Sequence, residues 1–404
     1  MSDTVNISDI DYASEDTSTH RRIPAPAVEG FRFGSLYGET STAAIWSATQ
    51  ISLDRPVTVW VMRPDRAADA SKAEHFDAVA RAAAHIQHLN LVQVIDVSRT
   101  ADGLPFAVFE NIDGANLAQI LHREGRLEPE RAMRITLELA SALDAAWKQI
   151  GFIHRNIKPE NILLADNRTV KITNFGSATL VTPGANPLAY DDDLMVGTPN
   201  YASPEQIECD PQIDFRTDIY GAGALLYQMI TGHAPFAEEN DPMRMLYLQI
   251  HGTLPSPSDM EPPVALSVSR LIQKMMAKSP ADRYAFWQDV IEDIRRVLAG
   301  RPLFAETSGK YAAPSSTIAD PTNPARLIAA GKNAPRRPAG YIVTKTSATS
   351  PASQSIARNQ APGCVAVFFG ALIILVSMFI TAYFRVNNLE KAEQVPLPVF
   401  DESE

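Results

Sequence analysis

Two polar segments of this chain carry residue types that could do chemistry. The first runs from His154 to Asn161 (HRNIKPEN), and the second (NFG) begins thirteen residues later at Asn174. The amide side chains of Asn156 and Asn174 donate and accept hydrogen bonds, but they carry no charge. A neutral amide lacks the charge that binds a hard dication and the basicity that accepts a proton. The segments therefore indicate a site with positioning groups and little capacity for acid–base or metal chemistry.

The two segments resemble the catalytic loop and the metal-binding loop of the Ser/Thr protein kinase family, with Asn where each loop of the family has Asp. In that family the first Asp orients the substrate hydroxyl and the second holds Mg²⁺. The resemblance implies that Asn156 and Asn174 are degenerate and that no metal site remains. Lys158 and Asn161 are retained, and in the family they contact the transferring phosphate and a metal ion. Hydrogen bonding within the loop is the other interpretation of these two residues.

Three motifs extend the resemblance towards the C-terminus. Residues 197–205 (GTPNYASPE) resemble the end of the activation segment, and 218–223 (DIYGAG) resemble a buried helix start whose Asp braces the catalytic loop. In the family, the Arg at position 283 pairs with the Glu at position 205. The resemblance implies an α+β, bilobal protein-kinase-like fold over residues 25–300, with a small β-rich N-lobe and a large helical C-lobe.

The elements that must position these loops precede them in the sequence. They resemble, in chain order, the first two strands with a glycine-rich turn, the third strand, the regulatory helix, and the strand leading to the hinge: 31–49, 51–65, 76–88 and 105–114. In the family the third strand carries a Lys that holds the phosphates, and Trp60 stands in its place. Counting nine residues back from His88 puts Val79 where the regulatory helix has the Glu that pairs with this Lys.

The loss of this Lys–Glu pair suggests a structural replacement. Val79 could pack against Trp60 as an apolar strut, because an unpaired buried Glu would be costly. An alignment error of two residues is the other interpretation of Trp60. The sequence offers little to support it, since the only lysine before Arg81 is Lys72, which lies beyond the strand.

The resemblance predicts a nucleotide pocket that has lost several of the residues that contact phosphates in the family. Of the glycine-rich turn only the first glycine, Gly38, is kept. The hinge implied by the resemblance offers backbone groups of Glu110 and Ile112 to an adenine, with Phe109 as the gatekeeper behind it, and Asn161 completes the candidate nucleotide-binding residues. No cofactor is expected to be required, and ATP binding without a metal stays open.

Composition limits the class of protein. The net charge of −11 argues against a general nucleic-acid binder, and two cysteines rule out a disulfide framework. Residues 1–24 are polar and acidic and predict disorder, and 301–363 are rich in Pro, Ala, Ser and Thr and predict a linker.

An uncharged apolar run, 364–384, is long enough to span a bilayer as one helix. A buried core helix is the other interpretation, but the run is apolar on all sides and follows the predicted linker. The linker carries eight Lys or Arg against two acids, and the short tail 385–404 carries two against five. Because basic flanks stay in the cytoplasm, we expect a single-pass membrane protein with the kinase-like domain on the cytoplasmic side.

These features together predict a membrane-anchored pseudokinase, a protein-binding scaffold or regulator in Ser/Thr kinase signalling. Its expected partner is an active kinase, a kinase substrate or a membrane complex assembled through residues 364–384. Two alternatives stay open: an atypical active Ser/Thr kinase that transfers the γ-phosphate of ATP to protein, and a nucleotide-binding switch.

Overall fold

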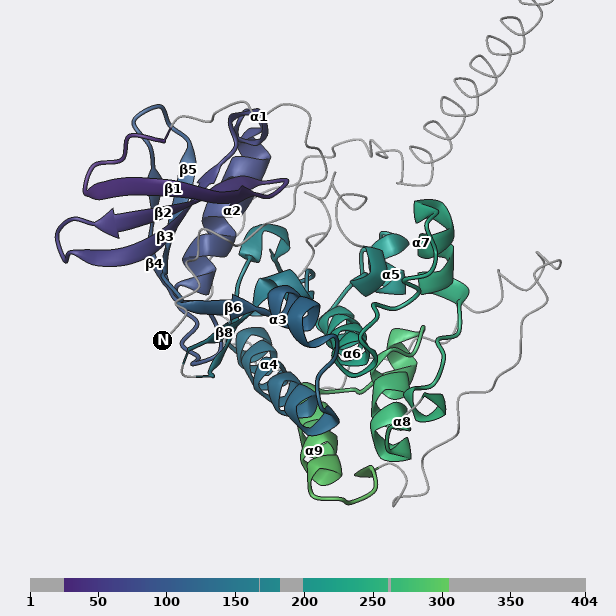
Figure 1. Ribbon diagram of the computed structural model, residues 1–404. Helices are drawn as coiled ribbons and strands as arrows, with labels where there is room; N and C mark the ends of the chain where they lie inside the picture. Colours follow the sequence, from purple (N-terminus) through teal and green to yellow (C-terminus); the bar gives the residue numbers. More distant parts are fainter. Residues whose placement is uncertain (1–24, 167, 182–198, 261–262, 305–404) are drawn as a thin grey trace, which may run out of the picture. The chain divides into compact units, whose positions relative to one another are not determined.

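The structure is a computed structural model that describes residues 25–166, 168–181, 199–260 and 263–304. Over these residues a β-rich lobe precedes a helical lobe (Figure 1), which confirms the expected bilobal α+β fold. Among the described residues, no helix combines the length and apolar composition that crossing a membrane requires. The predicted span 364–384 lies outside them, as do residues 1–24, the tail 385–404 and all but the first four residues of the linker 301–363.

The smaller lobe is built on an antiparallel five-stranded sheet with the order β1-β2-β3-β5-β4. Its strands are β1 (Phe31–Glu39), β2 (Ala43–Gln50), β3 (Arg55–Met62), β4 (Val94–Arg99) and β5 (Pro105–Glu110). Successive side chains of a strand point to opposite faces. Val57, Val59 and Val61 of β3 therefore join a small buried cluster on one face, while Trp60 and Met62 join the main core on the other.

Two helices follow β3: α1 (Pro64–Ala67) and α2 (Ala70–Ala83), which contacts β4 and β5. The side chain of Asp69 accepts hydrogen bonds from the backbone amides of Ser71 and Lys72, and such a cap fixes where a helix begins. The regulatory helix therefore starts six residues earlier than the expected segment 76–88 and also ends earlier. The third strand is likewise shorter than the expected 51–65, because residues 51–54 form a turn.

The larger lobe is mainly helical, with short strands at its upper edge. Its helices are α3 (Leu117–Glu124), α4 (Pro129–Ile150), α5 (Pro204–Ile207), α6 (Arg216–Thr231), α7 (Pro242–His251), α8 (Leu266–Met275) and α9 (Trp287–Leu298). The strands β6 (Gly114–Asn116), β8 (Ile162–Ala165) and β9 (Val170–Ile172) form one small sheet, and β7 (Phe152–Ile153) pairs with β10 (Thr179–Leu180). Single 3₁₀ turns are η2 (Pro159–Asn161), η3 (Phe175–Ser177), η4 (Pro199–Tyr201), η5 (Pro257–Asp259) and η6 (Pro280–Asp282).

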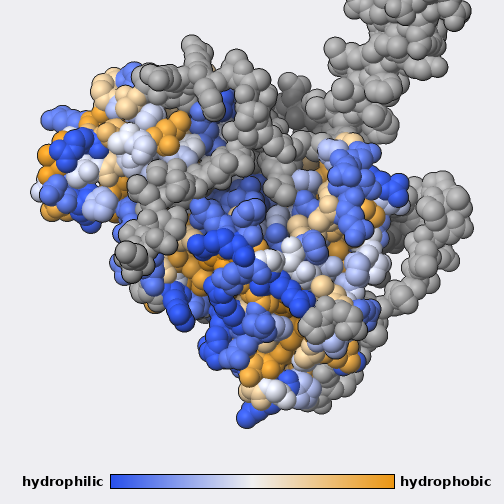
Figure 2. All heavy atoms as spheres, in the orientation of Figure 1, coloured by the Kyte–Doolittle hydropathy of each residue, from blue (hydrophilic) through white to orange (hydrophobic). Residues whose placement is uncertain are grey.

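Helix α6 forms the centre of this lobe. Nearly all of its residues are buried, and it packs against α4 and α8. Gly223 permits the close approach of α8, because a Cβ at this position would lie 2.8 Å from the Cβ of Met275. On the face shown in Figure 2, apolar residues lie among hydrophilic side chains over the larger lobe. The buried α6 is thus a fixed base on which the polar loops between β7 and η3 rest.

Candidate functional site

The loop that begins at His154 is joined to α6 by hydrogen bonds. The backbone amides of His154 and Arg155 each donate a hydrogen bond of 2.7 Å to the carboxylate of Asp218, in the first turn of α6. Burial raises the pKa of Asp218 to about 7, although the two amides and the Arg155 guanidinium oppose this shift. Arg155 has a positive φ of 65°, an unusual conformation for a residue with a side chain. The predicted brace of the catalytic loop by Asp218 is therefore confirmed.

His154 is fully buried and links this loop to the next polar segment. Its Nε2 donates to the carbonyl of Thr173 at 2.8 Å, and its Nδ1 accepts from the amide of Asn156 at 3.2 Å. An imidazole with one donor and one acceptor nitrogen is neutral. Burial accordingly lowers the pKa of His154 to about 4. The ring also lies edge-on to Phe175, with centroids 6.0 Å apart.

A chain of amide hydrogen bonds occupies the centre of the site. The Asn161 Nδ2 donates to the carbonyl of Asn156 at 2.7 Å, and the Asn174 Nδ2 donates to the Asn161 Oδ1 at 3.0 Å. The amide of Gly176 donates to the Asn174 Oδ1 at 3.3 Å. Each end of this amide network is therefore a backbone group, and both side chains are oriented by it. The structure brings Asn161 and Asn174 together, and it joins them to Asn156 through a backbone carbonyl.

The residues of the amide network do not fit a resident dication. Its side-chain groups are neutral, and an N–H of Asn174 points at the Asn161 oxygen that a cation would need. In the part of the chain that the structure describes, no group of three or more His, Cys, Asp or Glu residues could hold a metal ion. Asn161 makes hydrogen bonds within its loop, which supports the second interpretation of this residue. Lys158 is half-buried, and its carbonyl accepts from the amide of Asn161 at 3.0 Å.

Trp60 is buried where the phosphate-binding Lys was expected. It pairs with Ile45 of β2 and Ala107 of β5, so its register in the sheet is fixed on both sides. Its ring lies 5.5 Å from that of Phe109, which in turn lies 5.9 Å from that of Phe175. This row of aromatic rings extends from β3 to the polar loop.

Two small cavities adjoin these rings. The first, of about 60 Å³, is bounded by β3, α2 and η3, and the second, of about 40 Å³, by β3 and the hinge. Each has room for a few water molecules. Trp60 and Phe109 line both cavities and so form the boundary between them. Val79 is buried and lines the first cavity together with Trp60, so both side chains face the same cavity.

The second cavity contains part of the predicted nucleotide site. Glu110 and Ile112 line it, together with Asn174, whereas Gly38 and Asn161 are not among its lining residues. The carboxylate of Glu110 is committed elsewhere, because its Oε1 accepts from the Nζ of Lys171 at 2.6 Å and from the amide of Gln93 at 2.9 Å. The hinge therefore offers backbone groups rather than this side chain. Sequence reasoning missed the ion pair with Lys171, since nothing in the spacing pairs a hinge residue with β9.

Three basic residues lie at the first cavity, and of these the sequence analysis considered only Lys72, which it set aside as lying beyond the strand. Arg66, Lys72 and His75 line it, although no replacement cation could be placed from the sequence. The signal was present in Asp69: a helix that begins there puts Lys72 on the same face as Phe76 and Val79, at positions i, i+4 and i+7.

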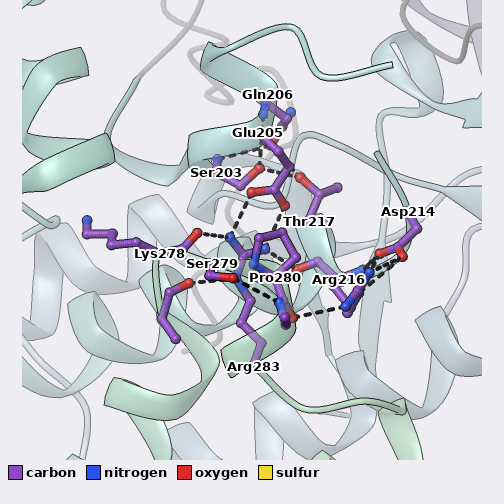
Figure 3. Close-up of polar contacts among 12 residues, drawn as sticks. Ser203, Glu205, Gln206, Asp214, Arg216, Thr217, Lys278, Ser279, Pro280 and Arg283 are labelled. Carbon is purple, nitrogen blue, oxygen red and sulfur yellow. Dashed lines mark hydrogen bonds and ion pairs between the residues drawn. The ribbon is translucent and has the colours of Figure 1, made fainter. Parts of the chain in front are cut away.

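The ion pair between Glu205 and Arg283 is confirmed. Two guanidinium nitrogens of Arg283 donate to the two carboxylate oxygens of Glu205 at 2.6 and 2.7 Å, and both residues are buried. Figure 3 shows that the guanidinium also reaches backbone carbonyls, those of Arg216 at 2.8 Å and Lys278 at 3.1 Å. The pair joins the segments before α6 and after α8 and takes no part in the polar loops. It belongs to the frame of the domain.

Comparisons with known proteins agree with the two-lobed fold described above. The model of the protein kinase domain matches residues 31–293. The chain is 31% identical over 282 residues to the serine/threonine-protein kinase PknB of Mycobacterium leprae, which covers 69% of this chain and 44% of that protein. It is 33% identical over 339 residues to PknB of Mycolicibacterium smegmatis, covering 83% and 53% respectively. The chain thus spans about half the length, or less, of these relatives.

Proposed function

This chain belongs to the protein kinase family, and we propose that it is a pseudokinase: a protein-binding scaffold or regulator in Ser/Thr kinase signalling that does not itself transfer phosphate. The relatives are named Ser/Thr kinases, which supports a role in this kind of signalling. The proposed difference between this chain and those relatives is the loss of phosphate transfer. It rests on one observation, the amide network among Asn156, Asn161 and Asn174.

The amide network supports the loss of catalysis for a physical reason. Phosphoryl transfer depends on positive charge held near the phosphates and on a group that orients the attacking hydroxyl. Here the side chains at these positions are neutral amides, and those of Asn161 and Asn174 bond to each other and to backbone groups. Trp60 adds a second obstacle, since a buried, uncharged indole stands where the family resemblance implies the phosphate-binding Lys. The losses reinforce each other because they remove different parts of the same electrostatic arrangement.

The frame supports a binding role. Asp218 still holds the loop at His154, and Arg283 still pairs with Glu205, so the kinase shape is kept where its chemistry is not. A protein partner such as an active kinase or its substrate would recognise this shape. We further propose that residues 364–384 anchor the chain in the membrane with the kinase-like domain in the cytoplasm, and that no nucleic acid is bound.

The experiment is thermal unfolding of the full chain with ATP, with ATP and Mg²⁺ or Mn²⁺, and with each metal alone. A scaffold without nucleotide shows no shift, and a nucleotide-binding switch shows the same rise with and without metal. A phosphotransfer assay on a generic protein substrate accompanies it, with Lys158→Met as the matched control. A metal-dependent shift, together with transfer that Lys158→Met abolishes, would overturn the pseudokinase proposal.

An active atypical kinase is the second candidate, and one observation favours it. Arg66 and Lys72 line the first cavity together with Trp60. Two cationic side chains therefore border the cavity that Trp60 lines, although β3 itself supplies no Lys. If these residues replace the missing Lys, Lys72→Gln abolishes phosphotransfer and Arg81→Gln, on the exposed side of the same helix, leaves it unchanged. No transfer in the unaltered chain removes this candidate.

Membrane anchoring has its own test. The full chain is expected in the membrane fraction after washing with high salt and with carbonate, whereas a chain that ends before residue 364 is expected in the supernatant. Release of the full chain by carbonate would contradict a spanning helix.

A further inference from the structure

The turn between β1 and β2, residues 40–42, differs in kind from the glycine-rich turn that it resembles. That turn has three glycines in the spacing G-x-G-x-x-G and covers the phosphates of ATP. Here Gly38 keeps the first of these positions, whereas Thr40 and Ala43 occupy the second and the third. A threonine in place of a glycine brings a hydroxyl group into the turn, and this hydroxyl can make hydrogen bonds that glycine cannot make.

The hydroxyl of Thr40 binds the backbone of its own turn. Its Oγ1 accepts from the amide of Thr42 at 3.2 Å and from the amide of Ala43 at 3.0 Å, and it donates to the carbonyl of Ala43 at 3.2 Å. The amide of Thr40 donates to the same carbonyl at 2.8 Å. Successive backbone amides in a turn are groups that can bind an anion, but two of them are used here by a side chain of the same turn.

The turn is also fastened to the end of β3. The amide of Arg63 donates to the carbonyl of Thr42 at 3.0 Å, and the Arg63 guanidinium lies 3.4 Å from the carboxylate of Glu39. Both side chains of this ion pair are more than 30% exposed, so the pair contributes little by itself. The backbone hydrogen bond and the ion pair hold the turn from its two ends.

On its inner side the turn meets the polar loop of the larger lobe at Gly176. A Cβ at Gly176 would lie 3.8 Å from the Thr42 Oγ1, 3.6 Å from the ring of Trp60 and 3.2 Å from the Asn174 Oδ1. The β1–β2 turn, β3 and the amide network therefore converge on one residue of η3. In the family, the phosphates of ATP lie beneath the turn that this segment resembles.

We propose that the β1–β2 turn is a closed lid, in which the Thr40 hydroxyl takes the amide hydrogen atoms that the family presents to phosphates and the turn rests on η3 in place of a nucleotide. The proposal rests on the proposed function, since a chain that transfers phosphate needs an open turn. The lid holds the two lobes together without a ligand, so a protein partner meets a preformed two-lobed surface.

The test is amide hydrogen exchange of the full chain, followed by mass spectrometry with each peptide referred to its own unfolded rate. Thr40→Val removes the hydroxyl and keeps the shape of the side chain. We expect exchange in the turn to become about fivefold faster, the change expected from one lost hydrogen bond. Exchange at residues 174–178 should also become faster, because the turn rests on them. Addition of ATP and Mg²⁺ should leave both segments of the unaltered chain unchanged.

Two further variants serve as controls. Thr40→Ser keeps the hydroxyl and should exchange as the unaltered chain does. Thr49→Val makes the same change of hydroxyl to methyl in β2, where residue 49 pairs with Arg32 and Pro56 outside the turn, and it should also have no effect on the two segments. Thr40 and Thr49 are both half-buried, and each substitution nearly conserves shape, so all the variants are expected to fold.

Each result decides the proposal. Faster exchange of both segments in Thr40→Val, with Thr40→Ser and Thr49→Val unchanged, supports the lid. Unchanged exchange in Thr40→Val, faster exchange confined to the turn, an equal effect of Thr40→Ser or Thr49→Val, or slower exchange of the unaltered chain with ATP overturns it. Any of these failures leaves the pseudokinase proposal intact as long as the phosphotransfer assay shows no transfer, so the two proposals fail separately.

Discussion

At the scale of single residues, Asn174 shows how one atom changes what the site can do. Its side chain donates to the Asn161 Oδ1 and accepts from the Gly176 amide, so an amide satisfies both neighbours. A carboxylate of the same shape has no proton to donate and would face the Asn161 oxygen with like polarity. The residue is therefore suited to this network and unsuited to a metal ion.

This argument predicts the outcome of Asn174→Asp. The variant should lose about 1–3 kcal/mol of unfolding free energy without metal, because Asn174 is buried and the new charge is left without a donor from Asn161. Mn²⁺ should restore part of the loss in the variant and leave the unaltered chain unchanged. The measurement is denaturant unfolding with and without Mn²⁺. Equal stability of both proteins in the absence of metal would contradict the role given to the amide network.

A second prediction at this scale concerns pH. The pKa of His154 is lowered from 6.5 to about 4, so the unfolded chain binds more protons between these values and stability falls as the pH falls through this window. Comparison of the unaltered chain with His154→Gln isolates the effect, because the opposing shift of Asp218 is common to both. The difference in unfolding free energy should be constant above pH 7. It should then shrink by up to about 1.4 kcal/mol per pH unit below 6.5.

The measurement for this prediction is urea unfolding at a series of pH values from 7.5 to 4.5. A difference between the two proteins that does not vary with pH would show that His154 is not buried in its neutral form.

At the scale of elements, β3 and α2 each bring an apolar side chain to one cavity, at the positions where the family resemblance implies an ion pair. Trp60 and Val79 line the same cavity and belong to the same buried cluster. The alternation of β3 and the helical spacing of α2 direct these two side chains to a common region. At these two positions the elements therefore carry no charge.

The double change Trp60→Lys and Val79→Glu tests this link. It should cost about 3–5 kcal/mol of unfolding free energy, because it removes a large buried side chain and places two charges in an apolar region. The matched control, Ser98→Lys with Ala78→Glu, introduces the same charges at exposed positions of β4 and α2 and should change stability little. Unchanged stability of the buried double variant would count against the strut hypothesis.

Helix α6 and the loop at His154 form a second pair of elements. Asp218 accepts two short hydrogen bonds from the loop backbone, and Asn at this position would turn an N–H towards one of them. Asp218→Asn should therefore lose about 2–4 kcal/mol, as expected for a buried donor without its acceptor. Asp289→Asn on the exposed side of α9 is the control. A loss no larger than that of the control would show that the brace is dispensable.

At the scale of the whole molecule, the Glu205–Arg283 pair ties together segments that are far apart in the sequence. The guanidinium bonds to the carboxylate and to three backbone carbonyls, those of Ala277, Arg216 and Lys278. Glu205→Gln should cost about 3–5 kcal/mol, because it leaves a buried Arg without its counter-ion.

A double-mutant cycle tests this interpretation of the pair. Glu205→Gln with Arg283→Met should cost less than the sum of the single changes, since the second change removes the uncompensated charge. Denaturant unfolding of the four proteins gives the coupling. Additive losses would show that the two residues act independently.

The amino-acid sequence by itself determined the family resemblance and the bilobal α+β fold, and it shows which residue types stand at the positions of the family motifs. Motif order and side-chain charge are local properties, so Asn156, Asn174 and Trp60 could be identified without coordinates. The pairing of Glu205 with Arg283 and the brace from Asp218 were also predicted, because their motifs imply them. The start of α2 was misplaced, since the apolar spacing begins at Phe76 whereas the cap lies at Asp69.

The tertiary structure decided which of these groups meet. The amide network, the ion pair of Glu110 with Lys171 and the cations at the first cavity each depend on residues from separate elements. The cap at Asp69 indicates only that Lys72 shares a helix face with Phe76 and Val79. No spacing encodes the other two contacts, because they arise only when the elements of the fold pack together. Residue type fixed what each group can do, and packing fixed which partner it has.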